Sequence, residues 1–543
     1  MTRSRMADAL TASSARRSAT AVLGLACLFV LVVSSVSAAR NSLVVDGTRY
    51  FWLDDDQMIS MRYARNLAEG CGPVWNRGER VEGYTNPLWV LVMAVVHLLP
   101  IADAHTSLWI RGINAALACL VLLLAWRLMQ RLMGEPGIAG AAGLLVLAVS
   151  HELLFWSMHG FETTLLTALF LWSIGRLLDE VERGSFRVLT FVAVGLLPVV
   201  RSDGYHLWVG AALLAVGLAK ERARVLGWLA LAAAPPIAQL AFRLAYYGEW
   251  VPNTYFLRVA GHSLPDRLRQ GAIYEAYFFL FYWLIVMLAV LGFLATRDRR
   301  RGWMLASSAI SLAYVIWVGG DNFFGARFLA PHAPVLIALA SAGIREIAAG
   351  RRVVERTLSL AQAGSYLAFA GFLALFGSSY TLLSDPNGGP GPSLIAALAI
   401  AKSTHPQARV AVHAAGVVPY FSRRYSIDWL GKTDAAVAKL PPRGAAMAHD
   451  KLDPQHSLNA QRADFAVMLW LPQGVGSCTS EARRLVEQVA PSWVREMYGS
   501  PAFQAEFCGG AIEMPGAPPI YARRGAGRVA LASRWEVPRV GGS

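Results

Sequence analysis

Long apolar runs separated by short polar connections fill the first 383 residues of the chain. A bilayer core is crossed by roughly 20 apolar residues in a helix, and most of the runs approach that length. The pattern therefore predicts a polytopic α-helical membrane protein. The runs are 19–39, 87–102, 107–126, 137–157, 162–178, 188–200, 204–219, 226–246, 275–296, 303–319, 328–349 and 358–382.

Basic residues cluster in five of the connections and indicate the side of the membrane that each one faces, because cytoplasmic loops carry an excess of Lys and Arg. If all five are cytoplasmic, everything from Ser384 onward lies outside. A cytoplasmic N-terminus then requires an odd number of crossings. The runs number twelve, so we expect about 11 transmembrane helices, with either one partial run, 87–102 being the first candidate, or one span that is split. The basic connections are Arg127–Arg131, Arg183–Arg187, Lys220–Arg224, Arg297–Arg301 and Arg345–Arg356.

The first run follows four arginines and ends at Val36-Ser37-Ala38, which resembles a signal-peptidase site. A signal core is shorter, about 7–15 residues, whereas this run is close to spanning length. We expect an uncleaved first transmembrane helix with its N-terminus in the cytoplasm. A cleaved signal peptide is the alternative.

The character of the sequence changes at Ser384. A Gly/Pro-rich stretch at 385–392 indicates a linker, and no run of spanning length follows it. Short apolar runs at 409–413 and 465–471 are typical of buried strands, and helices are expected near 393–403 and 481–489. The sequence thus predicts a transmembrane domain over 1–383 and an extracytoplasmic α/β domain over 384–543.

Composition agrees with a membrane protein, since 55% of the residues are hydrophobic, 16% are charged and the mean hydropathy is +0.41. The net charge of +14 comes from the short connections, so we expect no nucleic-acid partner. Cys478 and Cys508 fall in the second domain, where a disulfide is permitted, and we expect them to form one, with two free thiols as the alternative. The sequence has no His/Cys cluster with metal-ligand spacing, no P-loop and no nucleophile elbow.

The first outer loop, residues 40–86, carries three consecutive acids near the expected boundary of lipid and water. Asp55 or Asp56 can cap a short helix that Gly70 ends. This helix would carry Arg62 and Arg65 on its polar side.

After the helix, the segment Val74–Val81 is expected to form a small hairpin. A cap followed by an amphipathic surface helix is the plain alternative for the loop, but it accounts for one acid and not for three.

Further ionisable residues lie at the ends of the apolar runs. Such residues are costly inside a bilayer, so those retained there usually face a cavity or a partner. Glu162 is either a helix-start acid or a ligand contact, and Arg201 with Asp203 is either a structural pair or part of a site. Asp321 and Arg327 lie on the same predicted outer face, which favours a shared outward-facing cavity.

Two stretches of the first outer loop resemble a known family. They read DDQMISMRYARNLA from Asp55 and GERVEGYTNPLW from Gly78. Both are similar to the first outer loop of bacterial class C (GT-C) glycosyltransferases, above all the family of the actinobacterial terminal β-(1→2)-arabinofuranosyltransferase. That family typically reads DDAYISFRYARN and then NPGERVEGYTNPLW. The resemblance continues at 160–163, 247–254, 320–331, 416–421 and 428–434.

The resemblance implies a GT-C enzyme of the inner (cytoplasmic) membrane whose active site faces the periplasm. It implies a polyprenyl-phosphate sugar donor, with arabinofuranose as the sugar, and a glycan or other glycoconjugate of the cell envelope as acceptor. No cofactor is required, a divalent cation is left open, and no metal ligand is assigned. Another sugar such as mannose, a lipid-sugar flippase or other transporter, and a non-catalytic glycan-binding scaffold are the alternatives.

Phosphate is a good leaving group, so such a transfer needs one carboxylate to take the acceptor's hydroxyl proton and cations to hold the departing phosphate. We expect single displacement with inversion through an oxocarbenium-like transition state. Asp55 is the first choice for the base and Asp56 the second. The substrate-binding candidates are Arg62, Arg65, Asn66, Glu82, Tyr84, Asn86, Glu162, Arg201, Asn253, Asp321 and Arg327.

Overall fold

The structure of the chain is a computed structural model that describes residues 3–321, 323, 326–349, 391–444, 447–469, 471, 475, 478–525 and 538–540. The contacts between residues divide it into two compact units. Unit 1 comprises Met1–Ser37, Arg111–Gln239 and Arg267–Leu383, and unit 2 comprises Ala38–Ile110, Leu240–Asp266 and Ser384–Ser543. The first outer loop therefore belongs to the same unit as the C-terminal residues. The sequence analysis had counted this loop with the transmembrane domain, residues 1–383.

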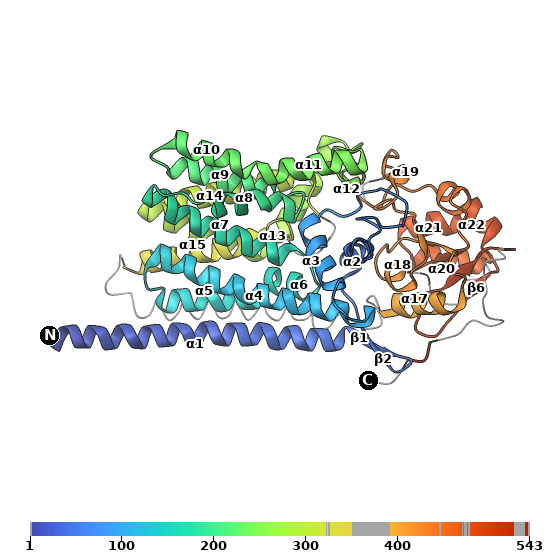
Figure 1. Cartoon of the computed structure of the whole chain (residues 1–543), viewed down its shortest axis with the longest axis horizontal. Coiled ribbons are helices and arrows are strands. Elements are labelled where there is room, and N and C mark those ends of the chain that lie inside the picture. Colours follow the sequence, from blue (N-terminus) through green and yellow to red (C-terminus); the bar gives the residue numbers. More distant parts are fainter. Residues whose placement is uncertain are drawn as a thin grey trace. The chain divides into compact units, whose positions relative to one another are not determined.

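Unit 1 is built from helices (Figure 1). Six stretches among the described residues are apolar and long enough to cross a membrane: Thr20–Arg40, Asp103–Met133, Gly137–Met158, Arg222–Tyr247, Leu264–Thr296 and Arg299–Val318. The chain is therefore a multi-pass membrane protein, as predicted. The helices that lie wholly or partly in this unit are α1 (Arg3–Arg40), α4 (Asp103–Met133), α5 (Gly137–Val149), α6 (His151–Met158), α7 (Thr163–Arg183), α8 (Val188–Val200), α9 (Tyr205–Leu218), α10 (Arg222–Ala232), α11 (Ala234–Tyr247), α13 (Leu264–Thr296), α14 (Arg299–Val318), η1 (Ala330–His332) and α15 (Ala333–Ala349).

The predicted apolar runs coincide with these helices, apart from two. Only Pro87–His97 of the run 87–102 is helical, and this helix, α3, has 11 residues, too few to cross a bilayer. The run 358–382 and most of the predicted linker lie outside the described residues. The expectation that 87–102 is partial therefore agrees with the structure, while the predicted number of about 11 crossings stays a prediction.

Small residues allow the helices of unit 1 to approach closely, as is common in membrane proteins. A Cβ added to Gly292 of α13 would lie 2.3 Å from the Cα of Gly343 in α15. One added to Gly143 of α5 would lie 2.2 Å from the hydroxyl of Ser341, also in α15. A side chain at Gly292 would collide with the backbone of α15, and one at Gly143 would require the Ser341 side chain to move.

Unit 2 contains a five-stranded sheet in the order β4–β3–β5–β7–β6. The inner strand β3 (Arg409–Val412) pairs in parallel with β4 (Tyr425–Asp428) and β5 (Phe465–Val467). β7 (Ile520–Ala522) and β6 (Ala511–Ile512) continue the sheet as antiparallel strands. The parallel strands are mostly buried, which explains their apolar sequences. The predicted sheet-containing C-terminal region is confirmed.

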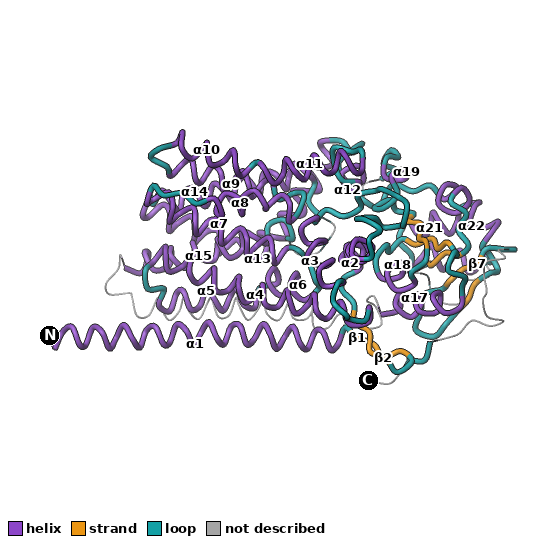
Figure 2. Tube along the Cα trace, viewed as in Figure 1, coloured by secondary structure: helices purple, strands orange, loops and turns teal. Residues whose placement is uncertain are grey.

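Helices surround this sheet, and Figure 2 distinguishes them from the strands and loops. Helix α2 packs against α3 and α18, while α18 packs against β3. A disulfide joins Cys478 and Cys508 inside the apolar core of the unit, which confirms the predicted pair. The helices of this unit are α2 (Asp55–Ala68), α3 (Pro87–His97), α12 (Asn253–Arg258), α17 (Gly391–Ser403), α18 (Val417–Ser422), α19 (Ala435–Ala438), η2 (Gln455–Ala460), α20 (Ser480–Val489), α21 (Ser492–Gly499) and α22 (Pro501–Glu506).

The hairpin predicted at Val74–Val81 is wrong, because that segment forms no strands. The side chain of Asn76 instead bonds to both the N–H and the carbonyl of Ser426 in β4, and the indole of Trp75 donates to the carbonyl of Ala415. The segment thus pairs with distant residues and not with itself. A hairpin does form earlier, between β1 (Ser42–Val45) and β2 (Thr48–Phe51).

Candidate functional site

The three acids of the first outer loop begin helix α2, but each has a different role. Asp54 is the N-cap, and its carboxylate accepts the N–H of Asp56 at 3.1 Å. The sequence assigned the cap to Asp55 or Asp56, so this assignment is corrected by one or two positions. Because Asp54 caps the helix, the carboxylates of Asp55 and Asp56 are available for contacts outside it.

Asp55 binds the segment that follows strand β3. Its Oδ1 accepts the N–H of Val417 at 2.9 Å and its Oδ2 accepts the N–H of Gly416 at 3.1 Å. A Cβ at position 416 would lie 1.9 Å from the carbonyl oxygen of Asp55, so only glycine fits there. The two N–H groups fix the carboxylate, and a carboxylate offers about four lone-pair sites, so two remain for other donors.

Asp56 forms an ion pair with Lys432. The two side chains remain about one quarter exposed, 25% for Asp56 and 24% for Lys432. Burial opposes the charged form of the lysine, but the carboxylates of Asp56, Asp55 and Asp428 outweigh this effect and raise the pKa of Lys432 above its usual range.

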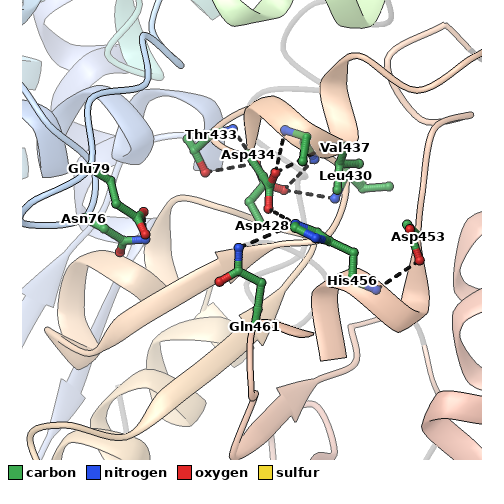
Figure 3. A network of polar contacts seen from close by, with 12 residues as sticks. Asn76, Glu79, Asp428, Leu430, Thr433, Asp434, Val437, Asp453, His456 and Gln461 are labelled. Carbon is green, nitrogen blue, oxygen red and sulfur yellow. Dashed lines mark hydrogen bonds and ion pairs between the residues drawn. The ribbon is translucent and has the colours of Figure 1, made fainter. Parts of the chain in front are cut away.

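Lys432 stands on a loop that a buried acid shapes. Asp428 ends strand β4, and its carboxylate accepts the N–H groups of Leu430, Gly431 and Thr433 and the hydroxyl of Thr433 (Figure 3). The amide of Asn253, a predicted site residue, donates to the carbonyls of Gly431 at 2.7 Å and Lys432 at 3.0 Å. The loop 428–434 is therefore held from both sides.

The far end of the same loop is also fixed. Asp434 accepts the N–H groups of Ala436 and Val437 and so caps helix α19. Its other oxygen lies 2.9 Å from Nε2 of His456, which in turn lies close to Gln461 (Figure 3). The loop 428–434 thus begins and ends with an acid, Asp428 and Asp434, whose carboxylate binds backbone N–H groups.

Burial controls the charges of the acid cluster. It raises the pKa of Asp54 to about 7, with the charge of Asp56 adding to the effect. It raises the pKa of Asp55 to about 6, although the N–H of Val417 favours the charged form. It also raises the pKa of Asp428 to about 6. Carboxylates with a pKa of about 6, such as those of Asp55 and Asp428, are mostly ionised at neutral pH yet basic enough to take a proton.

Arg62 and Arg65, expected on the polar side of the helix and named as substrate-binding candidates, are not on an exposed face. Both side chains are buried, 5% exposed each. Arg65 donates to the carbonyl of Tyr420 at 2.7 Å and lies over its ring. Arg62 donates to five acceptors, namely the carbonyl of Trp75, the carbonyl of Pro419, the hydroxyl of Ser426, the side chain of Asn76 and the carbonyl of Arg424.

These two arginines therefore connect α2 to the C-terminal residues of unit 2. The guanidinium of Arg62 has five N–H donors in a fixed plane, and its hydrogen bonds account for that number. The structure supports a structural role for Arg62, and no donor is left for a phosphate.

The other predicted residues of the first loop make local contacts in unit 2. Asn66 donates to the carbonyls of Val74 and Trp75, and Asn86 accepts from the hydroxyl of Ser60. Glu82 pairs with Arg243, where Nη2 lies 3.1 Å from Oε1.

Tyr84 lies edge-on to Tyr63, and its hydroxyl is 3.0 Å from that of Tyr247. Together with the Glu82–Arg243 pair, this contact fixes the loop to the end of α11 and stabilises the position of α2.

The remaining predicted residues form a separate group in unit 1. Arg201 lies between two acids, 3.0 Å from Asp203 and 3.4 Å from Glu162, and only 3% of it is exposed. Asp321 and Arg327 form an ion pair at 2.6 Å. The Arg201–Asp203 ion pair is thus present, and its role as a structural pair or as part of a site stays a prediction.

Aromatic rings surround Arg327, whose guanidinium carbon lies 5.0 Å from the ring of Phe323 and 5.4 Å from that of Phe161. Cations over aromatic faces are stabilised in this way. The predicted site residues thus form two groups, one in each unit.

Sequence reasoning missed Lys432, Asp428, Gly416 and Arg243. Lys432 and Asp428 lie in the segment 428–434, which resembles the family, and a lysine between two acids was a usable signal. Gly416 also lies in a resembling segment, but its contact with Asp55 spans 361 positions and leaves no local pattern. No group of three or more His, Cys, Asp or Glu in the described part of the chain could hold a metal ion, so the open divalent cation has no assigned ligands.

Comparison of the whole chain with solved structures defines the class of the fold. It resembles the crystal structure of ArnT from Cupriavidus metallidurans bound to undecaprenyl phosphate, with a TM-score of 0.54, 14% identity, and coverage of 93% of this chain and 98% of that one. It also resembles the oligosaccharyltransferase AglB from Archaeoglobus fulgidus in complex with an inhibitory peptide and a dolichol-phosphate, with a TM-score of 0.51, 13% identity, and coverage of 93% and 74%. The chain has the GT-C fold.

Sequence comparison points to particular relatives within this class. Terminal β-(1→2)-arabinofuranosyltransferase of Mycobacterium tuberculosis is 29% identical over 323 residues, which are 52% of this chain and 51% of that protein. The protein of the same name from Corynebacterium glutamicum is 27% identical over 327 residues, 53% and 47% respectively. The chain spans about half the length of the curated relatives it matches. Residues 393–511 match a domain of unknown function (DUF8728).

Proposed function

We propose that this protein is a membrane glycosyltransferase that transfers a sugar from a polyprenyl-phosphate donor to a glycan or other glycoconjugate of the cell envelope. The observation that carries the proposal is the pairing of a fixed carboxylate with a cation at the start of α2. Asp55 is held by two N–H groups, and the next residue, Asp56, holds the ammonium of Lys432. A base and a cation side by side are the groups that the reaction needs.

In the proposed reaction, the carboxylate of Asp55 takes the hydroxyl proton of the acceptor. The acceptor oxygen forms a bond to the anomeric carbon of the donor sugar while the bond from that carbon to the phosphate oxygen breaks. The bonding pair leaves with the polyprenyl phosphate, so no general acid is needed. Single displacement inverts the anomeric configuration. Asp56 is the second candidate for the base.

The relatives support the donor class and the sugar. A structure with this fold was solved with undecaprenyl phosphate bound, and the two curated relatives are named as arabinofuranosyltransferases. Arabinofuranose is therefore the first sugar to test, with mannose as the second. We place the enzyme in the inner (cytoplasmic) membrane with the acid cluster facing the periplasm, because the five basic connections are then all cytoplasmic.

A lipid-sugar flippase or other transporter is the competing function, since it too would be polytopic. Transporter sites lie near the middle of the bilayer and use interrupted helices. The acid cluster described above begins a helix in unit 2, outside the stretches long and apolar enough to cross a membrane. This position favours the transferase.

The test is transfer by the purified full-length protein in proteoliposomes, which keep the two sides of the membrane apart. A panel of radiolabelled polyprenyl-phosphate sugars is offered together with an arabinan oligosaccharide acceptor. We expect arabinofuranose to appear in the acceptor with the wild-type protein and not with the Asp55→Asn variant. Movement of intact lipid-linked sugar across the membrane without transfer would instead establish the transporter.

A further inference from the structure

Lys432 has properties that distinguish it from a lysine kept only for structure. We propose that its ammonium binds the phosphate group of the lipid-linked donor and that Asp56 positions it for this purpose. The inference rests on the proposed function, because it takes the donor to be a polyprenyl-phosphate sugar. It names a cation for the departing phosphate, a role for which the sequence analysis had offered only arginines among its substrate-binding candidates.

The first property is its fixed position on loop 428–434. The buried carboxylate of Asp428 binds three N–H groups and one hydroxyl of this loop. The amide of Asn253 binds the carbonyls of Gly431 and Lys432. Gly431 has a φ of +82° and no room for a Cβ, which would lie 2.8 Å from the N–H of Ala438. The backbone thus places Lys432 without help from its side chain.

The second property is spare hydrogen-bonding capacity. An ammonium has three donors, and the one hydrogen bond of Lys432 within the described residues goes to Asp56. Lys451, in the same unit, shows the contrast. It is 2% exposed and donates to the carbonyls of Phe256, Ala260 and Ala438, which uses all three donors. Lys432 is 24% exposed and keeps donors for a ligand.

The third property is its closeness to the proposed base, since the charge of Lys432 acts on Asp55 as well as on Asp56. Asp55 precedes Asp56 on α2, so the proposed base and the partner of Lys432 are adjacent in the chain. An ammonium shared by Asp56 and a phosphate lies between two anions and reduces the repulsion between them. A phosphate bound to Lys432 would therefore lie near the proposed base without direct contact with a carboxylate.

The plain alternative is an ion pair that only stabilises the fold. The two explanations differ in the variants that each predicts to be harmful. If the pair is only structural, Lys432→Gln is harmful because Asp56 loses its partner, and the double variant Asp56→Asn/Lys432→Gln repairs the defect. If Lys432 binds phosphate, the double variant is as defective as Lys432→Gln, while Asp56→Asn alone keeps the ammonium and is less defective, because it weakens only the positioning of Lys432.

The experiment compares two lipids that differ only in the phosphate. The dissociation constants of undecaprenyl phosphate and undecaprenol are measured for the purified full-length protein in the same detergent. We expect wild type to prefer the phosphate lipid, and Lys432→Gln and the double variant to lose about 10- to 100-fold of that preference, as for a lost hydrogen bond to a charged group. Lys432→Arg should keep most of it. Lys439→Gln, which breaks the exposed pair with Glu249, is the matched control and should change nothing.

The outcomes separate this inference from the proposed function. A wild-type preference that survives in both Lys432→Gln and the double variant overturns the role of Lys432 and leaves the proposed function intact. A wild-type protein that does not distinguish the two lipids overturns the phosphate-linked donor, and with it both proposals. Loss of the preference in Lys432→Gln with recovery in the double variant establishes the structural ion pair and overturns the inference.

Discussion

The carboxylate of Asp55 accepts a hydrogen bond from the backbone N–H of Gly416 at 3.1 Å, although 361 positions separate the two residues. The predicted base is thus oriented by the segment directly after strand β3, and not by its own helix. A change in the C-terminal residues of unit 2 can therefore alter turnover without contacting either substrate.

Asp55→Asn should reduce turnover by about 10²–10⁴-fold, because general-base catalysis typically supplies that factor and an amide cannot take the proton. The dissociation constant of the donor should change little, since the lost interaction is with the acceptor hydroxyl. Single-turnover rates and donor binding on the same preparation measure both quantities.

Asp54→Asn is the matched control for that variant. Asn caps a helix about as well as Asp, so the N-cap bond to Asp56 should survive and turnover should fall far less. If Asp55→Asn and Asp56→Asn both transfer sugar at near wild-type rates in a properly inserted protein, the acid cluster is structural and the proposed mechanism is wrong.

The raised pKa of Asp55, about 6, predicts the pH dependence of the rate. Below this pH the carboxyl is protonated and cannot accept a proton, so kcat/KM should fall as the pH decreases through about 6, and not through about 4 as for an exposed Asp. A profile that stays flat down to pH 5 would argue against Asp55 as the base.

Stability should move in the opposite direction over the same range. The folded state holds the proton of Asp55 more tightly than the unfolded chain, where the pKa is about 3.9. The contribution of this group to the free energy of unfolding is therefore greatest at low pH and is lost as the pH rises from about 4 to about 6. Thermal unfolding of wild type and Asp55→Asn across this range measures the difference.

Gly416→Ala should disrupt the support of the base. The new Cβ would lie 1.9 Å from the carbonyl oxygen of Asp55, a backbone atom that cannot rotate away. We expect a loss of about 1–3 kcal/mol from overpacking and a lower turnover, because the segment must shift away from Asp55. Gly499→Ala in the same unit meets no atom within 4 Å and should leave both quantities unchanged. Equal behaviour of the two variants would show that the contact is dispensable.

Patterns of neighbouring residues were enough to predict most of the helices and strands. Contacts between residues far apart in the sequence explain the predictions that were wrong. The apolar runs gave the helices of unit 1 because a membrane span depends on its own residues alone. The buried state of Arg62 could not be predicted, because its acceptors include Pro419, Arg424 and Ser426 at the other end of the chain. The same holds for the segment after α2, where Asn76 binds strand β4 and prevents a hairpin.

The buried pair of Glu82 and Arg243 offers a test of how the first loop is fixed. Both side chains are nearly inaccessible, 3% and 8% exposed. Glu82→Gln leaves the guanidinium buried without its counter-charge, which typically costs about 3–5 kcal/mol. Replacement of both residues, Glu82→Leu with Arg243→Met, removes both charges and should cost less than Glu82→Gln alone. The melting temperatures of these variants are compared for the full-length protein in one detergent. A double variant that is less stable than Glu82→Gln would contradict this account.

The orientation of the chain in the membrane follows from its basic connections and remains open to direct measurement. We expect the C-terminal residues of unit 2 to be extracytoplasmic, because all five basic connections then lie in the cytoplasm. An alkaline phosphatase fused after Ser543 should be active, and a green fluorescent protein at the same position should stay dark. The matched control is a pair of fusions at the basic connection 297–301, where the two readouts should be reversed. A fluorescent C-terminal fusion would place the acid cluster on the cytoplasmic side, away from any periplasmic acceptor, and would contradict the proposed reaction at its first step.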